Sequence, residues 1–254
     1  MISVVIPTLN AEQRLAACLT ALVAAAVEGL VREVIAVDGG SSDRTLRIAD
    51  QAGIEVMTSP AGRGVQLVAG ARRARQPWLL FLHADTVLGH GWESEASRFM
   101  ERVDLGHVPP SAATFRFALD DRGMAPRLLE RLVAARGVVF ARPYGDQGLL
   151  IPRRLYDEIG GYRPMPLMED VDIVGRLGRK RLARLSATAT TGAERYRKRG
   201  YIRRVARNQV CLALHALGAA PERIQRVYSF DGEDNTDATP DASGTRRRER
   251  MNST

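Results

Sequence analysis

Residues 33–43 have the sequence EVIAVDGGSSD, in which a short apolar run ends at Asp38 and gives way to a glycine-serine turn. The run from Glu33 to Val37 predicts a strand, because β-branched and apolar residues bounded by turn residues are typical of buried strands. The residues after the turn, 43–52, predict a helix. Parallel strands need a crossover of this kind, so the stretch predicts a parallel sheet with helices packed on it.

The same plan continues on both sides of this stretch. Upstream, Val4–Pro7 predicts a strand, and Asn10 begins a capped helix that reaches about residue 28. Downstream, the patterns predict a strand over 54–59, a helix over 64–73 and a fully apolar strand over 78–82. We therefore expect an α/β fold: a single domain with a mostly parallel central sheet and helices on both faces. Ligands of such sheets bind beyond the carboxyl ends of the strands, which is where Asp38 and Asp85 fall.

The alternation of predicted strands and helices is less regular beyond residue 85. It predicts a helix over 91–103, a strand over 113–117, a helix over 126–136, a strand over 148–151, and helices over 153–159 and 169–180. Apolar residues at helical spacing over 202–217, with arginines off the stripe, predict a C-terminal amphipathic helix. Polar composition predicts a disordered tail over 231–254, so the folded domain is expected to span 1–230.

Composition narrows the class of protein. Apolar residues make up 45% of the chain and charged residues 26%, which are ordinary globular values and exclude a fibrous or wholly disordered protein. Cys18 and Cys211 lie far apart without a metal-ligand spacing, which excludes a disulfide framework and a cysteine zinc site. The chain shows no basic leader and no apolar run of about 18 residues, so we expect a cytoplasmic protein.

The net charge of +8 is concentrated in one segment. Residues 171–230 contain 14 basic and 3 acidic residues, a net charge of +11, and nearly all of the basic residues are arginine. Arginine grips phosphate oxygens in pairs, so a phosphorylated small molecule, an anionic membrane surface and nucleic acid are candidate partners. A merely solvated arginine face is the alternative. For the helix over 202–217, packing in the fold, a homodimer contact and peripheral docking on anionic lipid all remain open.

Motifs decide between these classes. The P-loop and dinucleotide fingerprints are absent from the sequence, which excludes P-loop kinases and Rossmann dehydrogenases. Four other motifs occur in order: SVVIPTLN at 3–10, VDGGSSD at 37–43, FLHAD at 81–85, and GGY at 160–162 with Met-Glu-Asp at 168–170. Together they resemble the family-2 glycosyltransferases of GT-A fold over residues 1 to about 200. The resemblance is strongest to a compact bacterial subset with His-Ala-Asp in place of Asp-x-Asp.

The resemblance implies a nucleotide-sugar donor, a UDP- or GDP-hexose, bound by residues 1–105. It implies a hydroxyl acceptor seated by 106–200, helices over 201–230, and a divalent cation, Mn²⁺ or Mg²⁺, at the diphosphate. The implied reaction is transfer of the sugar to the acceptor with inversion. Two alternatives remain: transfer with retention, and a non-catalytic protein that binds an anionic surface. Aromatic residues are few, 6%, and form no stacking platform, so we expect no nucleic-acid partner.

Asp85 is the expected metal ligand, because Mg²⁺ needs only one or two protein carboxylates when phosphates and water complete its shell. Asp38 is expected to accept hydrogen bonds from the base or ribose, and Gly39 to let the backbone approach closely. For each aspartate the alternative is an ordinary turn residue, and Asp43 could simply cap a helix. Arg63 would bind the diphosphate or remain solvated. The other residues that the resemblance assigns to the donor are Pro7, Asn10, His83 and Ala84.

The resemblance makes Asp170 the base that removes the proton of the acceptor hydroxyl. Glu169 would orient Asp170 or touch acceptor hydroxyls, although acids in a first helical turn also stabilise a helix by themselves. Asp146 and Gln147 would bind sugar or acceptor hydroxyls, with a simple turn as the alternative. In the family a loop often closes over the diphosphate at the position of Arg195 and Arg199, which assigns these two residues to leaving-group stabilisation.

Overall fold

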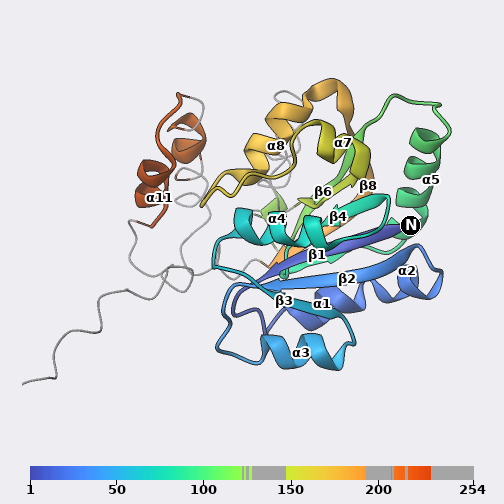
Figure 1. The fold of residues 1–254 in the computed structure, drawn as a ribbon, viewed down its shortest axis with the longest axis horizontal. Helices are drawn as coiled ribbons and strands as arrows, with labels where there is room; N and C mark the ends of the chain where they lie inside the picture. The colour runs from blue at the N-terminus through green and yellow to red at the C-terminus, as the bar shows by residue number, and fades with distance from the viewer. Residues whose placement is uncertain are drawn as a thin grey trace, which may run out of the picture.

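The computed structural model describes residues 1–121, 123, 126–127, 147–192, 207, 209–214 and 217–229. The predicted helices over 126–136 and 202–217 lie mostly outside these ranges, and the predicted tail over 231–254 lies wholly outside them. Within the described residues, the strands form one sheet in the order β3-β2-β1-β4-β7-β6-β8-β5 (Figure 1). The strands are β1 Ile2–Thr8, β2 Val31–Asp38, β3 Glu55–Thr58, β4 Trp78–Phe81, β5 Thr86–Leu88, β6 Ala112–Asp120, β7 Leu149–Pro152 and β8 Leu182–Gly192.

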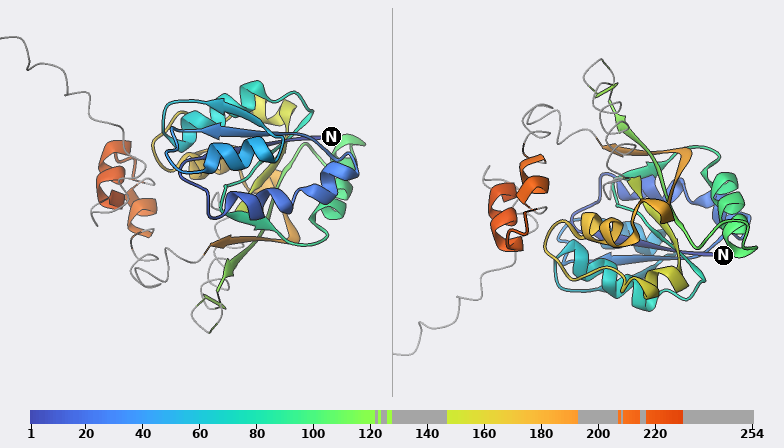
Figure 2. Two further views of the ribbon diagram at one scale, coloured as in Figure 1. Left: turned by 90° about the horizontal axis from the view of Figure 1, so that it is seen from below. Right: turned by 90° about the horizontal axis from the view of Figure 1, so that it is seen from above.

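Helices connect these strands and cover both faces of the sheet. They are α1 Leu15–Thr20, α2 Val23–Val27, α3 Thr45–Gln51, α4 Arg63–Arg73, α5 Trp92–Asp104, α7 Arg153–Glu158 and α8 Glu169–Leu177, with a 3-10 turn at Arg179–Arg181. A further helix, α11 Pro221–Ser229, follows the last strand. Because successive side chains of a strand point to opposite faces, Val4 and Ile6 of β1 enter one core cluster and Val5 enters the other. The expected α/β architecture with helices on both faces is confirmed (Figure 2).

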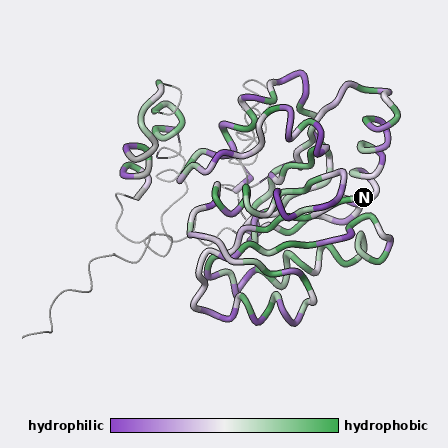
Figure 3. The backbone as a smooth tube through the Cα atoms, in the orientation of Figure 1, coloured by the Kyte–Doolittle hydropathy of each residue, from purple (hydrophilic) through white to green (hydrophobic). Residues whose placement is uncertain are grey.

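The two clusters show which helices cover which face. The first cluster contains buried side chains of α1, α2 and α5, among them Leu15, Ala25 and Trp92. The second contains Leu67 of α4 and Leu155 of α7, together with side chains of α8. The central strands between these layers are mainly hydrophobic, and the outer helices are mixed (Figure 3). The sheet core therefore lies between α1, α2 and α5 on one side and α4, α7 and α8 on the other.

The second half of the sheet departs from the sequence patterns. β7 runs antiparallel to both β4 and β6, whereas β6 and β8 are parallel to each other. β5 and β8 were not expected, because β5 has three residues and β8 is rich in Thr and Ala rather than in large apolar residues. The helix expected to reach residue 28 is two short helices, and α8 ends at Leu177, where Gly178 takes a positive φ of 72°.

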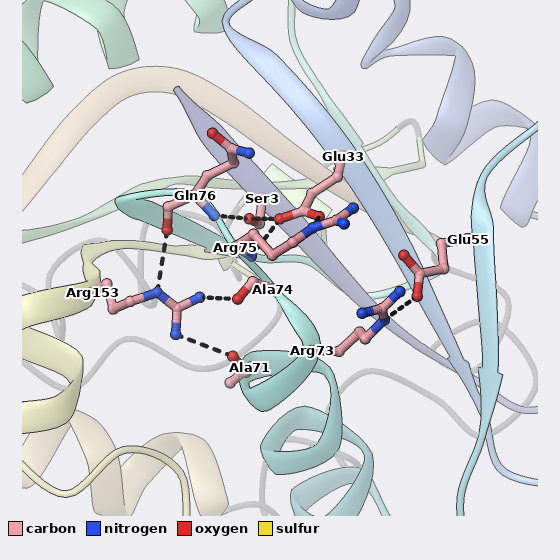
Figure 4. Close-up of polar contacts among 9 residues, drawn as sticks. All are labelled: Ser3, Glu33, Glu55, Ala71, Arg73, Ala74, Arg75, Gln76 and Arg153. Carbon is pink, nitrogen blue, oxygen red and sulfur yellow. Dashed lines mark hydrogen bonds and ion pairs between the residues drawn. The ribbon is translucent and has the colours of Figure 1, made fainter.

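A polar network joins the elements at the amino-terminal edge of β1 and β4 (Figure 4). Arg153 at the start of α7 donates to the carbonyls of Ala71 and Ala74 at the end of α4, at 3.2 and 2.6 Å. It also donates to the carbonyl of Gln76 at 3.2 Å. Because the last carbonyls of a helix have no partner within it, one guanidinium caps α4 and ties it to α7.

Candidate functional site

The carboxyl ends of β1, β2 and β4 lie at one edge of the sheet. Thr8 pairs with Asp38, and Val5 pairs with Phe81 in the parallel registers of β1 with β2 and β4. The segments that leave these strands, 7–10, 38–43 and 83–85, therefore begin side by side. Three of the four motifs found in the sequence meet at this edge, as expected for a ligand site in an open α/β sheet.

Asp38 is almost completely buried and is engaged by its own surroundings. Its Oδ1 accepts hydrogen bonds from the hydroxyls of Thr8 and Ser41, at 3.1 and 2.5 Å. Its Oδ2 accepts from the backbone amides of Gly40 and Ser41, at 2.9 and 2.8 Å. The carboxylate thus shapes the turn after β2, which is the turn role that the sequence left open; its contact with a base or ribose stays a prediction.

The turn after β2 is interlocked with the segment after β1. Asn10, at a positive φ of 48°, accepts a hydrogen bond from the backbone amide of Ser42 at 3.0 Å. Asp43 accepts from the backbone amides of Glu12 and Thr45, at 3.0 and 2.9 Å. Burial raises the pKa of Asp43, but the hydrogen bonds from Thr45 and Glu12 outweigh it and leave this pKa below its usual value. Asn10 and Asp43 therefore hold two site loops together, whatever else they bind.

Gln66 of α4 contributes to the same edge and was not singled out in the sequence. Its buried Nε2 donates to the carbonyls of Thr8 and Val37, at 2.8 and 2.7 Å. A Cβ on Gly39 would lie 3.2 Å from this amide nitrogen, which explains why a residue without a side chain occupies position 39. A polar residue within an otherwise apolar helix stripe, Gly64–Ala71, was the available clue.

The start of α4 lies directly against the segment that leads into α8. A Cβ on Gly64 would come within 2.6 Å of the carbonyl oxygens of Arg163 and Met165. The neighbouring Arg63 places its Nη1 3.4 Å from Glu169 Oε1 and 3.9 Å from Asp170 Oδ2. Arg63 is thus joined to the two acids of the fourth motif, which stand more than 100 residues away in sequence.

His83 reaches the same acids from the end of β4. Its Nε2 lies 4.0 Å from Asp170 Oδ2. Asp170 Oδ1 accepts a hydrogen bond from the hydroxyl of Tyr162 at 3.3 Å. Tyr162 is buried, and its ring packs edge-on against Phe81 at a centroid distance of 4.8 Å. The tyrosine of the Gly-Gly-Tyr motif therefore supports the carboxylate of Asp170, a role that the sequence did not assign.

Glu169 is the most deeply buried acid of the group, with 1% of its surface exposed. Burial raises its pKa, and the charge of Asp170 raises it further, while Arg63 opposes both. Its Oε1 has no hydrogen-bond partner, although it is close enough to Arg63 for an ion pair. The residue before it, Met168, has a positive φ of 69°, a conformation that costs energy for a residue with a side chain. The start of α8 is therefore held in a strained and charged arrangement.

Asp85 follows His83 in the turn between β4 and β5. Its Oδ1 is 3.5 Å from the hydroxyl of Thr86, and the turn is closed by a bond from the Thr86 amide to the His83 carbonyl. Within the described ranges, no group of three or more His, Cys, Asp or Glu side chains is placed to hold a metal ion. A carboxylate such as that of Asp85 could hold a hard cation only together with other ligands, such as the oxygens of a diphosphate and water.

For the remaining predicted residues, the structure gives burial or a position in a strand, or does not describe them. Ala84 is buried in the first core cluster, so only its backbone is available to a ligand. Gln147 is 6% exposed and lies two residues before Leu149, which pairs with Phe81 of β4. Pro7 lies at the end of β1, paired with Val37. Asp146, Arg195 and Arg199 lie outside the described residues.

Comparisons with solved structures agree on the fold. The chain matches glucosyl-3-phosphoglycerate synthase from Mycobacterium tuberculosis in complex with Mn²⁺ and UDP-glucose with a TM-score of 0.58 and 21% identity, over 87% of this chain and 80% of that one. It matches S. aureus TarS in complex with UDP-GlcNAc with a TM-score of 0.56 and 19% identity, over 75% of this chain and 58% of that one. A mycobacterial protein gives a TM-score of 0.53 and 22% identity, over 76% of this chain and 65% of that one. The chain thus spans less than two thirds of the length of the latter two proteins.

The helices were also examined for membrane-spanning segments, and the sequence was compared with curated proteins and with family models. No helix in the described part of the chain combines the length and the apolar character needed to span a membrane. No curated protein sequence matches the chain. The family model of glycosyl transferase family 2, however, matches residues 3–186, which include all four motifs and every predicted site residue except Arg195 and Arg199. The chain therefore belongs to glycosyl transferase family 2.

Proposed function

We propose that this glycosyltransferase moves a hexose from a UDP- or GDP-sugar to a hydroxyl acceptor, with inversion, at the edge formed by β1, β2 and β4. The observation that carries the proposal is the meeting of Arg63, His83 and Asp170 from three separate segments of the chain. The solved proteins of similar fold bind Mn²⁺ with UDP-glucose, and UDP-GlcNAc, which supports a nucleotide-sugar donor here. A donor half over 1–105 and an acceptor half over 106–200 remain part of the proposal.

Asp85 would hold a divalent cation, Mn²⁺ or Mg²⁺, which when bound neutralises the charge that develops on the leaving diphosphate. His83 precedes Asp85 by two residues in the motif His-Ala-Asp, so its imidazole would lie near the bound donor. Arg63, at the first residue of α4, lies where its guanidinium and the free amides of the helix start favour phosphate oxygens. The protein would thus bind the diphosphate from the sheet edge and from α4.

Asp170 is the proposed base. An inverting transfer needs a group that takes the proton of the acceptor hydroxyl as its oxygen attacks the anomeric carbon. Tyr162 holds Oδ1 of Asp170, and Oδ2 faces Arg63 and His83 and would receive the proton. Glu169 would position this group through the shared Arg63. Asp170→Asn should lower kcat by about 10²- to 10⁴-fold and leave donor affinity nearly unchanged.

The donor assignment is tested by thermal shift with a panel of UDP- and GDP-sugars, with and without Mn²⁺. A bound donor raises apparent stability by mass action, so at least one sugar nucleotide should raise the Tm in the presence of metal. Asp85→Ala should abolish the metal-dependent part of this shift. Asp50→Ala, at an exposed position of α3, is the matched control and should retain it. No shift with any donor, or an unchanged shift in Asp85→Ala, would refute the proposal.

The stereochemical outcome needs its own measurement. The anomeric configuration of the product, read by NMR, should be opposite to that of the donor sugar. Retained configuration would remove the role of Asp170 as the base but would leave the donor site standing.

A further inference from the structure

Arg14 is a charged residue that the site described so far does not use. It is the residue that precedes α1, and its Nη1 lies 2.9 Å from Asp120 Oδ2 at the end of β6. A Cβ on Gly192, the last residue of β8, would lie 3.2 Å from its Cζ, Nε and Nη2. The guanidinium therefore lies against Gly192, close to where a side chain at position 192 would begin.

The strand register sets this guanidinium near Asp85. β5 and β8 are antiparallel, with Thr86 opposite Thr191. Asp85 is the turn residue directly before Thr86, and Gly192 directly follows Thr191, so Asp85 and Gly192 lie at the same end of the β5–β8 pairing. The guanidinium of Arg14, which lies against Gly192, is therefore at the end of the sheet where Asp85 lies.

An independent contact places the same face of α1 against the His83–Asp85 turn. Cys18 follows Arg14 by four residues and so lies on the same side of the helix. Its buried Sγ donates to the carbonyl of His83 at 3.5 Å. Burial raises the pKa of the Cys18 thiol, and the negative charge of Asp85 raises it further. The face of α1 that carries Arg14 is therefore turned toward the proposed metal ligand.

Arg14 and Arg63 approach the site from opposite sides of the sheet. α1 belongs to the layer of the first core cluster, and α4 belongs to the layer of the second. A cation held by Asp85 would bring a diphosphate to the edge of the sheet that both arginines border. The carboxylate of Asp120, one partner of Arg14, is 60% exposed, and ion pairs with an exposed member contribute little to stability.

We propose that Arg14 binds the diphosphate of the nucleotide donor, from the α1 side of the sheet, as the counterpart of Arg63 on the α4 side. This inference rests on the proposed function, because it assigns one more residue to the same donor site. The alternative is a purely structural role, in which Arg14 ties α1 to the ends of β6 and β8 through Asp120.

The two roles differ in what they do to phosphate recognition. Binding of UDP, GDP, UMP and GMP is measured by calorimetry in the presence of Mn²⁺, for the wild type and for Arg14→Gln, Arg14→Lys and Asp120→Asn. If Arg14 contacts the diphosphate, Arg14→Gln weakens binding of the preferred diphosphate about tenfold or more, and weakens the monophosphate by much less. Arg14→Lys recovers part of the loss. Asp120→Asn, which frees the guanidinium from its competitor, leaves diphosphate affinity unchanged or raises it.

The outcomes separate the inference from the proposed function. Wild-type protein that binds neither diphosphate would overturn the proposed function itself. Wild-type binding that Arg14→Gln leaves intact would overturn only the role of Arg14. Equal losses in Arg14→Gln and Asp120→Asn, for diphosphate and monophosphate alike, would show the structural tie and would also overturn it. Thermal unfolding of each variant in the absence of nucleotide shows whether a loss of binding reflects a loss of folded protein.

Discussion

At the residue scale, the tightest approach in the site is made by Gly64 at the start of α4. Its absent Cβ would meet the backbone of Arg163 and Met165, atoms that cannot move aside as the end of a long side chain can. Gly64→Ala should therefore destabilise the fold by about 1–3 kcal/mol and weaken donor binding, because the segment before α8 must shift.

The matched control for this change lies in α8. Gly175 is exposed and a Cβ there would meet nothing within 4 Å. Gly175→Ala should be neutral or stabilise by about 0.5–1 kcal/mol, because alanine restricts the unfolded chain and favours a helix. Urea unfolding measures both variants. Equal effects would show that the contact between α4 and the 163–165 segment is not tight in solution.

A second residue-scale prediction concerns the charge of Glu169. Its pKa is raised by burial and by the charge of Asp170, so the folded protein binds the proton more tightly than the unfolded chain does. The stability from this group is complete below its usual pKa of 4.5 and is lost as the pH rises through the folded value. Glu169→Gln, neutral at every pH, should therefore be more stable than the wild type at pH 7, with an advantage that shrinks at pH 4.

Unfolding by urea at the two pH values checks this difference. Glu28→Gln, at an exposed position of the chain, is the control and should show no such pH-dependent gain. A Glu169→Gln variant that is destabilised more at pH 7 than at pH 4 would show that Arg63 stabilises the carboxylate, and equal effects at the two pH values would show that the charge does not matter; either outcome contradicts the prediction. Activity should fall in either case, because the proposed function uses the negative charge of Glu169, although burial of this charge destabilises the folded protein.

At the element scale, Arg153 holds α4 and α7 together far from the site. Three carbonyl acceptors, at the end of α4 and just beyond it, share its guanidinium (Figure 4). Arg153→Met keeps the aliphatic stem but removes these bonds, and it should cost about 1.5–3 kcal/mol. Arg73→Ala, whose ion pair with Glu55 is largely exposed, should cost less than about 1 kcal/mol. Denaturant unfolding distinguishes them, and similar costs would mean that the cap is weak.

The elements also show how far sequence patterns predict this fold. β1, β2 and β4 are apolar runs that end in turn residues, so local composition alone places them and their site residues. β8 alternates threonine and alanine, and its place in the sheet is decided by pairing with β6 and β5 over long sequence separations. The Arg14 contact with Gly192 depends on that pairing. A pattern read along the chain therefore predicts His83 and Asp85 but not their neighbour across the sheet.

At the scale of the whole molecule, the sheet brings residues from all of the motifs to one edge. Some of these residues bond to the surrounding loops, and others contact one another. The sequence left Arg63 open between a diphosphate contact and a solvated residue, and the structure places it beside Glu169 and Asp170. The sequence left a turn role for Asp38 open, and it did not predict that Asn10 would bond a loop amide or that Gln66 and Tyr162 would support the site. These roles depend on burial and on side-chain direction, which a single sequence does not contain. The acid pair could be singled out because the sequence at 168–170 resembles the Glu-Asp motif of the family.

The arrangement of the sheet also predicts which backbone amides a bound donor will protect from hydrogen exchange. The loops at the carboxyl edge carry backbone amides that exchange through local opening, and a ligand that binds the closed form slows this exchange. Hydrogen exchange with UDP or GDP and Mn²⁺ should therefore slow at 39–43, 62–65, 83–86 and 168–171. The opposite edge, where Glu28, Gly29, Glu93 and Ser97 line a shallow hollow, should be unchanged. Protection confined to that hollow would place the nucleotide at the wrong end of the sheet, whereas protection at the carboxyl edge that Asp85→Ala removes would tie it to the metal ligand.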